Sequence, residues 1–189
     1  MNRETNRGAA LVLAIIAIFL MTALSASLAL LTSTELRISS SHAEGMELRY
    51  AAEAALDTIA QEMIAAGDWN GAITGTLLSA FSDGMPAGAR TLVDGSSINL
   101  DDLTGLAVAD NPTFRLFGFG PVSRLQPGEI VRIDGYLAVW IGGDLDGNAA
   151  SLVVRAVALG RAGLRRIVEA RLFRTEDGAV RVAGWHELR

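Results

Sequence analysis

An uncharged apolar run at residues 9–31 constrains the fold of this 189-residue chain more than any other feature. As a helix, these 23 residues would be about 35 Å long, which is enough to cross a hydrocarbon core of roughly 30 Å. The leader at residues 1–8 carries Arg3 and Arg7 against a single Glu4, so we expect it to remain cytoplasmic. We therefore predict a transmembrane helix over residues 9–34. A cleaved secretory signal is the alternative, although its apolar core is normally about half as long.

The helical pattern continues beyond this run. Residues 35–66 contain no proline, and their one glycine, Gly45, together with serines at 39–41, marks the expected weak point of the helix. Apolar residues recur with the period of one helix face, at Leu48, Ala52, Ala55, Leu56, Ile59 and Met63. Arg49 and Glu53 are spaced to pair on the polar side. We predict an amphipathic helix whose apolar stripe requires a soluble partner.

Residues 67–189 are long enough for one globular domain. Residues 67–129 are rich in turn signals, so we expect loops, one short helix and one or two brief strands there, with a role in partner recognition. Alternating apolar residues predict strands at 130–141, 152–159, 164–174 and 180–185, with a glycine-flanked hairpin loop at 160–163. Packing the amphipathic helix on this antiparallel meander of about four strands gives an α+β fold.

Two segments carry a family resemblance. They are RGAALVL at residues 7–13, which opens the apolar helix, and RYAAEAAL at residues 49–56. This region resembles the N-terminal part of type IV pilins, in particular minor pilins of the PilX type, and GspK-type minor pseudopilins of type II secretion are similar. The resemblance implies a pilin-like fold, a prepilin peptidase that cuts after Gly8, and a mature N-terminus at Ala9. It also implies an assembly helix, including Leu13, Ala14 and Ala17, that packs against other major and minor pilins.

The fifth mature position departs from the pattern of ordinary pilins. Those pilins carry a glutamate there, which can neutralise the terminal amine of a neighbouring subunit, whereas this chain has Leu13. Because an unpaired charge in an apolar filament core is costly, the resemblance implies a minor subunit that acts in filament initiation or at the tip. It implies insertion in the bacterial inner membrane with a periplasmic C-terminal domain, and contact with the inner-membrane assembly platform. The alternatives are a type II secretion pseudopilin, whose inserted domain is usually larger, and a signal-anchored periplasmic binding domain.

Metal and cofactor chemistry has little support in the sequence. The chain has no cysteine and two histidines, His42 and His186, which excludes thiolate and multi-histidine sites. Asp144, Asp146 and Asn148 present oxygens at alternate positions, as a calcium loop does. We favour a plain turn, because Arg155 stands where an EF-hand would place its closing glutamate. We expect no other cofactor.

One basic cluster and two pairs of neighbouring carboxylates are the remaining candidates for a binding or catalytic site. An arginine cluster could contact nucleic acid, but the formal charge of −5 favours a solvated strand face paired with Glu169 and Glu176. No nucleophile or histidine accompanies the close carboxylate pairs, one on a helix face and one in a turn-rich loop, so we expect no enzymatic activity. We expect His42 to be solvated and His186 to cap the last strand. The residues concerned are Arg161, Arg165 and Arg166 in the cluster, and Glu53 with Asp57 and Asp101 with Asp102 as the carboxylate pairs.

Overall fold

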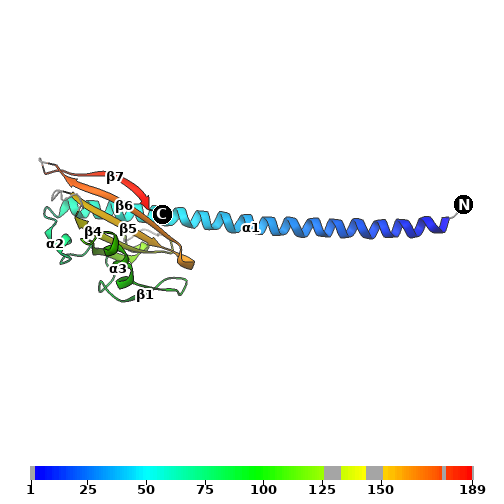
Figure 1. The fold of residues 1–189 in the computed structure, drawn as a ribbon, viewed down its shortest axis with the longest axis horizontal. Helices are drawn as coiled ribbons and strands as arrows, with labels where there is room; N and C mark the ends of the chain where they lie inside the picture. The colour runs from blue at the N-terminus through cyan, green and yellow to red at the C-terminus, as the bar shows by residue number, and fades with distance from the viewer. Residues whose placement is uncertain (1–2, 126–132, 144–150, 176–177, 189) are drawn as a thin grey trace. The chain divides into compact units, whose positions relative to one another are not determined.

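The computed structural model describes residues 3–125, 133–143, 151–175 and 178–188, with side chains from residue 10 onwards. The chain forms two compact units, residues 1–43 and residues 44–189. Helix α1 (Arg3–Ala65) begins in the first unit and ends in the second. In the described part of the first unit, every residue is helical (Figure 1).

Helix α1 confirms the predicted continuous helix, with ends that differ slightly. It starts within the expected leader, at Arg3, and stops at Ala65 rather than at residue 66. The segment around Gly45 remains helical, and its glycine has a packing role. A Cβ atom at Gly45 would lie 2.7 Å from the guanidinium of Arg166, so the glycine leaves room for that side chain against the helix. After the helix, Gly67 adopts a left-handed conformation with φ of +62° that suits glycine.

The second unit is built on an antiparallel sheet with the strand order β3-β4-β5-β6-β7 (Figure 1). The predicted meander is confirmed as β4 to β7, but the sheet has five strands because β3 joins it from the segment expected to be mostly loops. Residues 130–132 of the first predicted meander strand lie outside the described residues, and β4 itself begins at Tyr136, after residues 133–135 that are not in a strand. The last strand extends to Leu188 rather than to residue 185. The bounds are β3 (Arg115–Pro121), β4 (Tyr136–Gly143), β5 (Ser151–Leu159), β6 (Arg165–Arg174) and β7 (Val180–Leu188).

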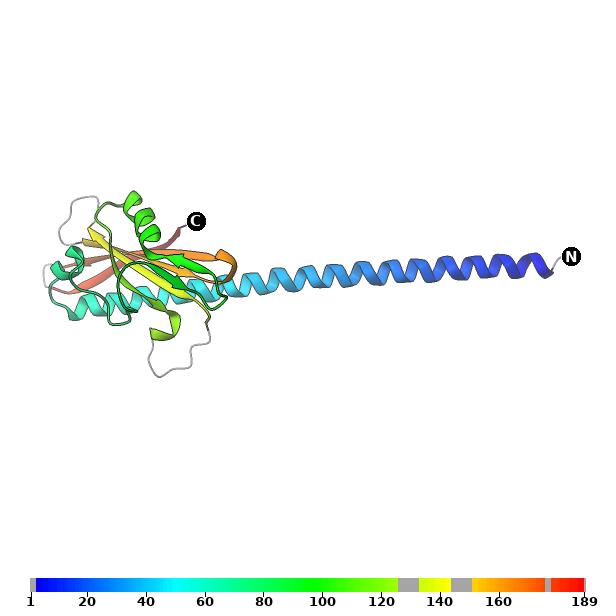
Figure 2. The same ribbon diagram turned by 90° about the horizontal axis from the view of Figure 1, so that it is seen from below.

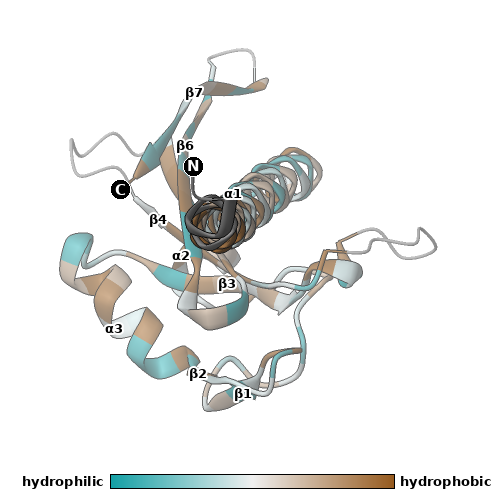
Figure 3. Ribbon diagram, turned by 90° about the vertical axis from the view of Figure 1, so that its right-hand side faces the viewer, coloured by the Kyte–Doolittle hydropathy of each residue, from teal (hydrophilic) through white to brown (hydrophobic). Residues whose placement is uncertain are grey.

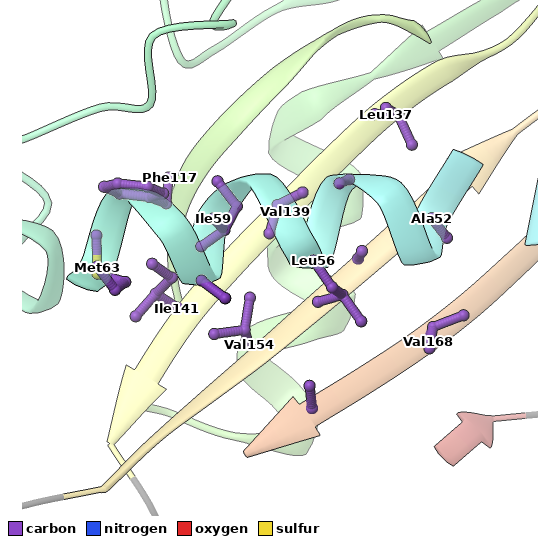
Figure 4. Close-up of a cluster of buried hydrophobic side chains, with 14 of the residues drawn as sticks. Ala52, Leu56, Ile59, Met63, Phe117, Leu137, Val139, Ile141, Val154 and Val168 are labelled. Atoms are coloured by element: carbon purple, nitrogen blue, oxygen red, sulfur yellow. The ribbon is translucent and has the colours of Figure 1, made fainter. Parts of the chain in front are cut away.

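The predicted apolar stripe of α1 packs on one face of this sheet. Every member is nearly or fully buried, and Ile59, Ala52 and Met63 are 0% exposed. They contact alternate residues of β4, β5 and β6, among them Val139 and Val154 (Figure 4). Burying one large aliphatic side chain contributes about 1.5–3 kcal/mol relative to leaving it in water. The stripe therefore forms the main hydrophobic core of the second unit.

The opposite face of the sheet is covered in part by α3 (Leu100–Asp110) (Figure 2). The expectation of loops with one short helix at residues 67–129 is wrong here, because α3 has 11 residues and α2 (Asn70–Thr74) is a second helix. The side chain of Asn99 accepts a hydrogen bond from the backbone N–H of Asp101 and caps α3. The same region contains β1 (Ala89–Thr91), β2 (Ser97–Asn99) and the 3₁₀ turn η1 (Val122–Arg124), and a second 3₁₀ turn, η2 (Arg161–Gly163), joins β5 to β6.

The outer edge of β3 is covered by the chain that follows α2. The backbone N–H groups of Ser79 and Asp83 donate to the carbonyls of Phe117 and Phe119, each at 2.7 Å. The side chain of Phe81 packs over Gly118, where an added Cβ atom would lie 2.7 Å from its ring. This segment therefore satisfies backbone groups that would otherwise form an open sheet edge.

Candidate functional site

In the first unit, residues 10–31 present an apolar surface on all sides of the helix, whereas residues 32–43 are more polar and include Glu35 and Arg37. Residues 10–43 are all exposed within the described structure, and the large exposed side chains include Leu11, Phe19 and Leu28. A helix that is apolar around its whole circumference requires an apolar environment. Among the described residues, one helix, spanning residues 10–65, is long and apolar enough by length and composition to cross a membrane, a criterion that a signal sequence also meets.

The hydroxyl groups within this surface are satisfied by the helix itself. The Thr22 hydroxyl donates to the carbonyl of Phe19 at 2.8 Å, and the Ser25 hydroxyl donates to that of Met21 at 2.9 Å. Ser27, Ser33 and Thr34 make equivalent bonds to carbonyls three or four residues before them. Because these donors need no water, the helix can be placed in lipid or among other apolar helices without leaving a hydroxyl unpaired.

The residues predicted for processing and assembly lie at the beginning of α1. Gly8 and Ala9 are both helical. Leu13 is 67% exposed, and Ala14 and Ala17 are exposed as well. A small residue at these two positions lets another helix approach closely. The position that carries glutamate in ordinary pilins therefore presents an exposed aliphatic side chain here.

Polar contacts lie at both ends of the buried stripe of α1. The predicted Arg49–Glu53 pair is confirmed at 2.9 Å, and Glu187 of β7 lies 3.7 Å from Arg49. At the C-terminal end, the indole N–H of Trp69 donates to the carbonyl of Met63 at 3.0 Å. The ion pair with Glu187 links the start of the stripe to β7, and the Trp69 bond ties the segment after α1 back to the end of the stripe.

Glu62 links α1 to the inserted segment. One of its carboxylate oxygens accepts hydrogen bonds from the Ser79 hydroxyl at 2.8 Å and from the Ala80 backbone N–H at 3.1 Å. These bonds join residues 17 and 18 positions apart in the chain. The segment that covers the edge of β3 is therefore anchored to the helix.

The candidate calcium ligands Asp144, Asp146 and Asn148 lie outside the described residues, so the calcium hypothesis stays a prediction. Within the part of the chain that the structure does describe, no group of three or more histidine, aspartate or glutamate side chains could hold a metal ion.

The three arginines proposed for nucleic-acid contact have different surroundings. Arg161 forms an ion pair with Asp134. Arg166 donates to the carbonyl of Gly45 at 3.3 Å and lies 3.8 Å from Glu187. Arg165 faces the opposite side of the sheet from Arg166, because neighbouring strand residues alternate between faces. The three side chains therefore do not form one basic surface.

The candidate carboxylates and histidines also occupy separate places. Glu53 is paired with Arg49, as described above, while Asp57 is exposed. Asp101 and Asp102 lie in the first turn of α3, which corrects the expectation of a loop. One carboxylate oxygen of Asp101 accepts a hydrogen bond from the backbone N–H of Gly88 at 3.0 Å. One member of each pair, Glu53 and Asp101, therefore has a structural partner.

The two histidines lie on different elements, His42 on α1 and His186 in β7. His42 is exposed on α1, as predicted. His186 does not cap the last strand as expected but lies within β7, and its Nε2 is 3.5 Å from a carboxylate oxygen of Glu169. The cause is that β7 extends beyond its predicted end and pairs residue 186 with residue 169 of β6.

A partly buried ion-pair network is a feature that the sequence did not predict. Arg155, whose side chain is 12% exposed, binds Glu169 of β6 at 3.0 Å and Asp110 of α3 at 2.7 Å. Its guanidinium lies 4.8 Å from the ring centre of Phe114. The signal in the sequence was an arginine inside the otherwise apolar strand SLVVRAVAL, because a buried cation requires an acidic partner. Glu169 therefore pairs with Arg155 and His186 rather than with the predicted arginine cluster.

Residues 7–57 of the chain match a family model described as PilX N-terminal. Comparison with curated proteins and with solved structures gives no match. The matched segment contains the apolar part of α1 and the start of its buried stripe, and α1 packed on an antiparallel sheet is the pilin-like α+β architecture expected from the resemblance. Members of this family are structural pilins that interact with other pilins in a pilus, and they are not enzymes. The match over residues 7–57 thus supports a PilX-type type IV pilin.

Proposed function

We propose that this pilin is a minor subunit that acts in the initiation of a type IV pilus or at its tip. The observation that carries the proposal is the aliphatic, 67% exposed side chain of Leu13 on a helix that is otherwise ready for an apolar environment. Along a filament shaft, each terminal amine requires a neighbouring carboxylate, because an unpaired charge among apolar helices is costly. A subunit without that carboxylate fits best where no further subunit above requires it.

The route to the filament begins in the inner membrane. The chain is inserted by its N-terminal helix, the leader remains cytoplasmic, and the second unit lies in the periplasm. Prepilin peptidase cuts after Gly8, and Ala9 becomes the mature N-terminus. The exposed residues of α1, including Ala14 and Ala17, then exchange lipid for the helices of other major and minor pilins on the assembly platform.

The hydroxyl bonds within α1 support this exchange of environment. A side chain that needed water would oppose burial among other helices, whereas Thr22 and Ser25 already donate to their own helix. Enzymatic activity is not part of the proposal. Calcium binding near Asp144 and nucleic-acid contact through Arg165 are separate hypotheses.

The processing step is tested by mass spectrometry of the mature N-terminus in cells that contain prepilin peptidase. We expect an N-terminus at Ala9, and we expect Gly8→Val to prevent the cut. An N-terminus close to Ser27 would contradict the proposal, because signal cleavage would remove the membrane helix. An uncut chain would favour a signal-anchored periplasmic domain.

The position in the filament is tested by quantitative mass spectrometry of sheared pili. We expect trace amounts of this chain relative to the major pilin, and fewer pili per cell when it is deleted. Leu13→Glu supplies the missing carboxylate and should raise the amount found in the shaft, while Leu11→Glu places the same charge at another position and should not. Stoichiometric incorporation of the unchanged chain along the shaft would refute a tip or initiation role. Pili of normal number in the deletion strain, with impaired protein secretion, would favour a type II pseudopilin.

A further inference from the structure

An open groove of about 460 Å³ lies between α3 and the sheet face that α3 covers in part. One wall is the side of α3 formed by Leu103, Leu106 and Ala107, and the floor is formed by β4, β5 and β6. Leu106 is 61% exposed although it faces this groove. The hydropathy colouring shows apolar bands along α3 (Figure 3). The volume lies within the range of roughly 300–1,000 Å³ that is typical of small-molecule sites.

The floor of the groove offers apolar surface without free hydrogen-bonding groups. Trp140, Val157 and Ile167 line it. Trp140 is only 1% exposed and its indole N–H donates to the Thr104 hydroxyl at 3.1 Å, so the small part of the ring that a ligand can reach is carbon. Water in contact with such a floor is poorly bound, and replacing it with an aliphatic chain is favourable.

The groove is lined by two arginines and one aspartate, and this excess of positive charge favours an anionic ligand. Arg155 and Asp110 both line the groove, but they are bound to each other at 2.7 Å, and Arg155 also binds Glu169. Arg165 also lines the groove, and within the described part of the chain its side chain has no ion-pair or hydrogen-bond partner, although its backbone pairs with Leu159 of β5. The groove therefore combines an apolar floor with one uncompensated guanidinium, the group best suited to bind a carboxylate through two hydrogen bonds.

We propose that this groove binds a small aliphatic carboxylate, with its hydrocarbon chain between Leu106 and the floor and its carboxylate on Arg165. An eight-carbon acid places an apolar chain and an anionic end on these two features. An alkyl ammonium ion would meet Arg165 with the same charge, and a neutral alcohol would leave the guanidinium unpaired. This site is independent of the role proposed for α1, so either can fail without the other.

The test uses the full-length protein in nanodiscs of zwitterionic lipid. We titrate 8-bromooctanoate and record tryptophan fluorescence, because bromine quenches an indole ring that it contacts. We expect saturable quenching with a dissociation constant below about 1 mM, after subtraction of the signal from 8-bromooctanol at the same concentrations. Trp140→Phe should remove the saturable part and leave only weak, linear quenching of the exposed Trp185.

Two surface variants test the parts of the site separately without disturbing the core. Arg165→Gln should weaken binding about tenfold, because a charge-assisted pair is lost. Arg181→Gln, on exposed strand β7, is the matched control and should leave binding unchanged. Leu106→Gln should weaken binding by removing part of the apolar wall, and its side chain is exposed enough for folding to be unaffected.

Three results would overturn the proposal. The first is quenching that rises linearly with no saturation. The second is equal affinity of the unchanged protein and Arg165→Gln, and the third is equal affinity for 8-bromooctanoate and its alcohol. Calorimetric titration with octanoate gives a second readout that does not depend on Trp140, and an absence of saturable heat below about 1 mM would have the same meaning.

Discussion

Ile59 and Ile64 provide a direct measure of what the buried stripe of α1 contributes to stability. Ile59 is 0% exposed in the core between α1 and the sheet, whereas Ile64, five positions later on the same helix, is 56% exposed. Replacing a buried isoleucine with alanine costs about 2–5 kcal/mol through lost burial and the cavity that remains. The same change at an exposed position costs within about 0.5 kcal/mol.

Both substitutions change the intrinsic helix propensity in the same direction, since alanine is favoured over isoleucine by a few tenths of a kcal/mol at either site. The difference between Ile59→Ala and Ile64→Ala therefore isolates the packing against β4, β5 and β6. For a unit of this size, 1 kcal/mol lowers the melting temperature by about 2–4 °C, so we expect Ile59→Ala to lower it by about 4–20 °C. Ile64→Ala should change it by no more than about 2 °C.

Thermal unfolding of the full chain in detergent micelles, followed by near-UV circular dichroism, measures this difference. All three tryptophans, Trp69, Trp140 and Trp185, lie in the second unit, so the signal does not report on the membrane helix. Equal shifts for the two variants, or a shift below about 2 °C for Ile59→Ala, would refute the conclusion that the stripe forms the main core.

Three further predictions concern the sheet. Arg155→Met leaves the Glu169 carboxylate, which is 13% exposed, with His186 as its remaining neighbour at 3.5 Å and should cost about 1–3 kcal/mol in chemical unfolding, most of which the double variant with Glu169→Met should recover. Burial raises the pKa of Tyr136, so the folded state disfavours the ionised phenol. The contribution of Tyr136 to stability is therefore fully present below about pH 10 and is lost as the pH rises through the folded pKa. Tyr136→Phe should reduce this alkaline loss of stability, measured by urea titrations. Gly142→Ala would place a Cβ atom 2.6 Å from a threonine hydroxyl and should destabilise the protein by about 1–3 kcal/mol in thermal unfolding. The Cβ atom of Gly105→Ala in α3 would meet nothing within 4 Å, so this variant should be more stable by about 0.5–1 kcal/mol.

The elements that were predicted correctly are those whose burial follows a regular period. The α1 stripe repeats every three to four residues, and β5 is a nearly unbroken apolar run, so a local pattern was sufficient in both cases. Strand β3 did not give such a pattern, because Gly118 and Gly120 interrupt it. Those glycines are required by the segment around Phe81, which lies far away in the sequence and could not be placed from local pattern alone.

Helix α3 and the partners of Arg155 in the groove could not be predicted from local sequence pattern either. Only Leu100 and Ala107 of α3 are buried, and Gly105 and the acidic pair at its start resemble a turn-rich loop. The partners of Arg155 come from α3 and from β6, 45 and 14 positions away. An arginine in an apolar strand indicates that acidic partners exist, but only the register of β5 with β6 identifies Glu169 as one of them.

The two halves of α1 obey different physical requirements, and this separates stability from assembly. Residues 10–34 contribute exposed apolar surface and self-bonded hydroxyls, whereas the stripe from Leu48 to Met63 contributes buried contacts within the second unit. A change at Leu13 therefore acts on the surroundings of the helix and leaves the core of the second unit intact, while a change at Ile59 acts on that core. Leu13→Glu should accordingly alter incorporation into pili at an unchanged melting temperature, and a lowered melting temperature for that variant would show that the two functions of the helix are coupled.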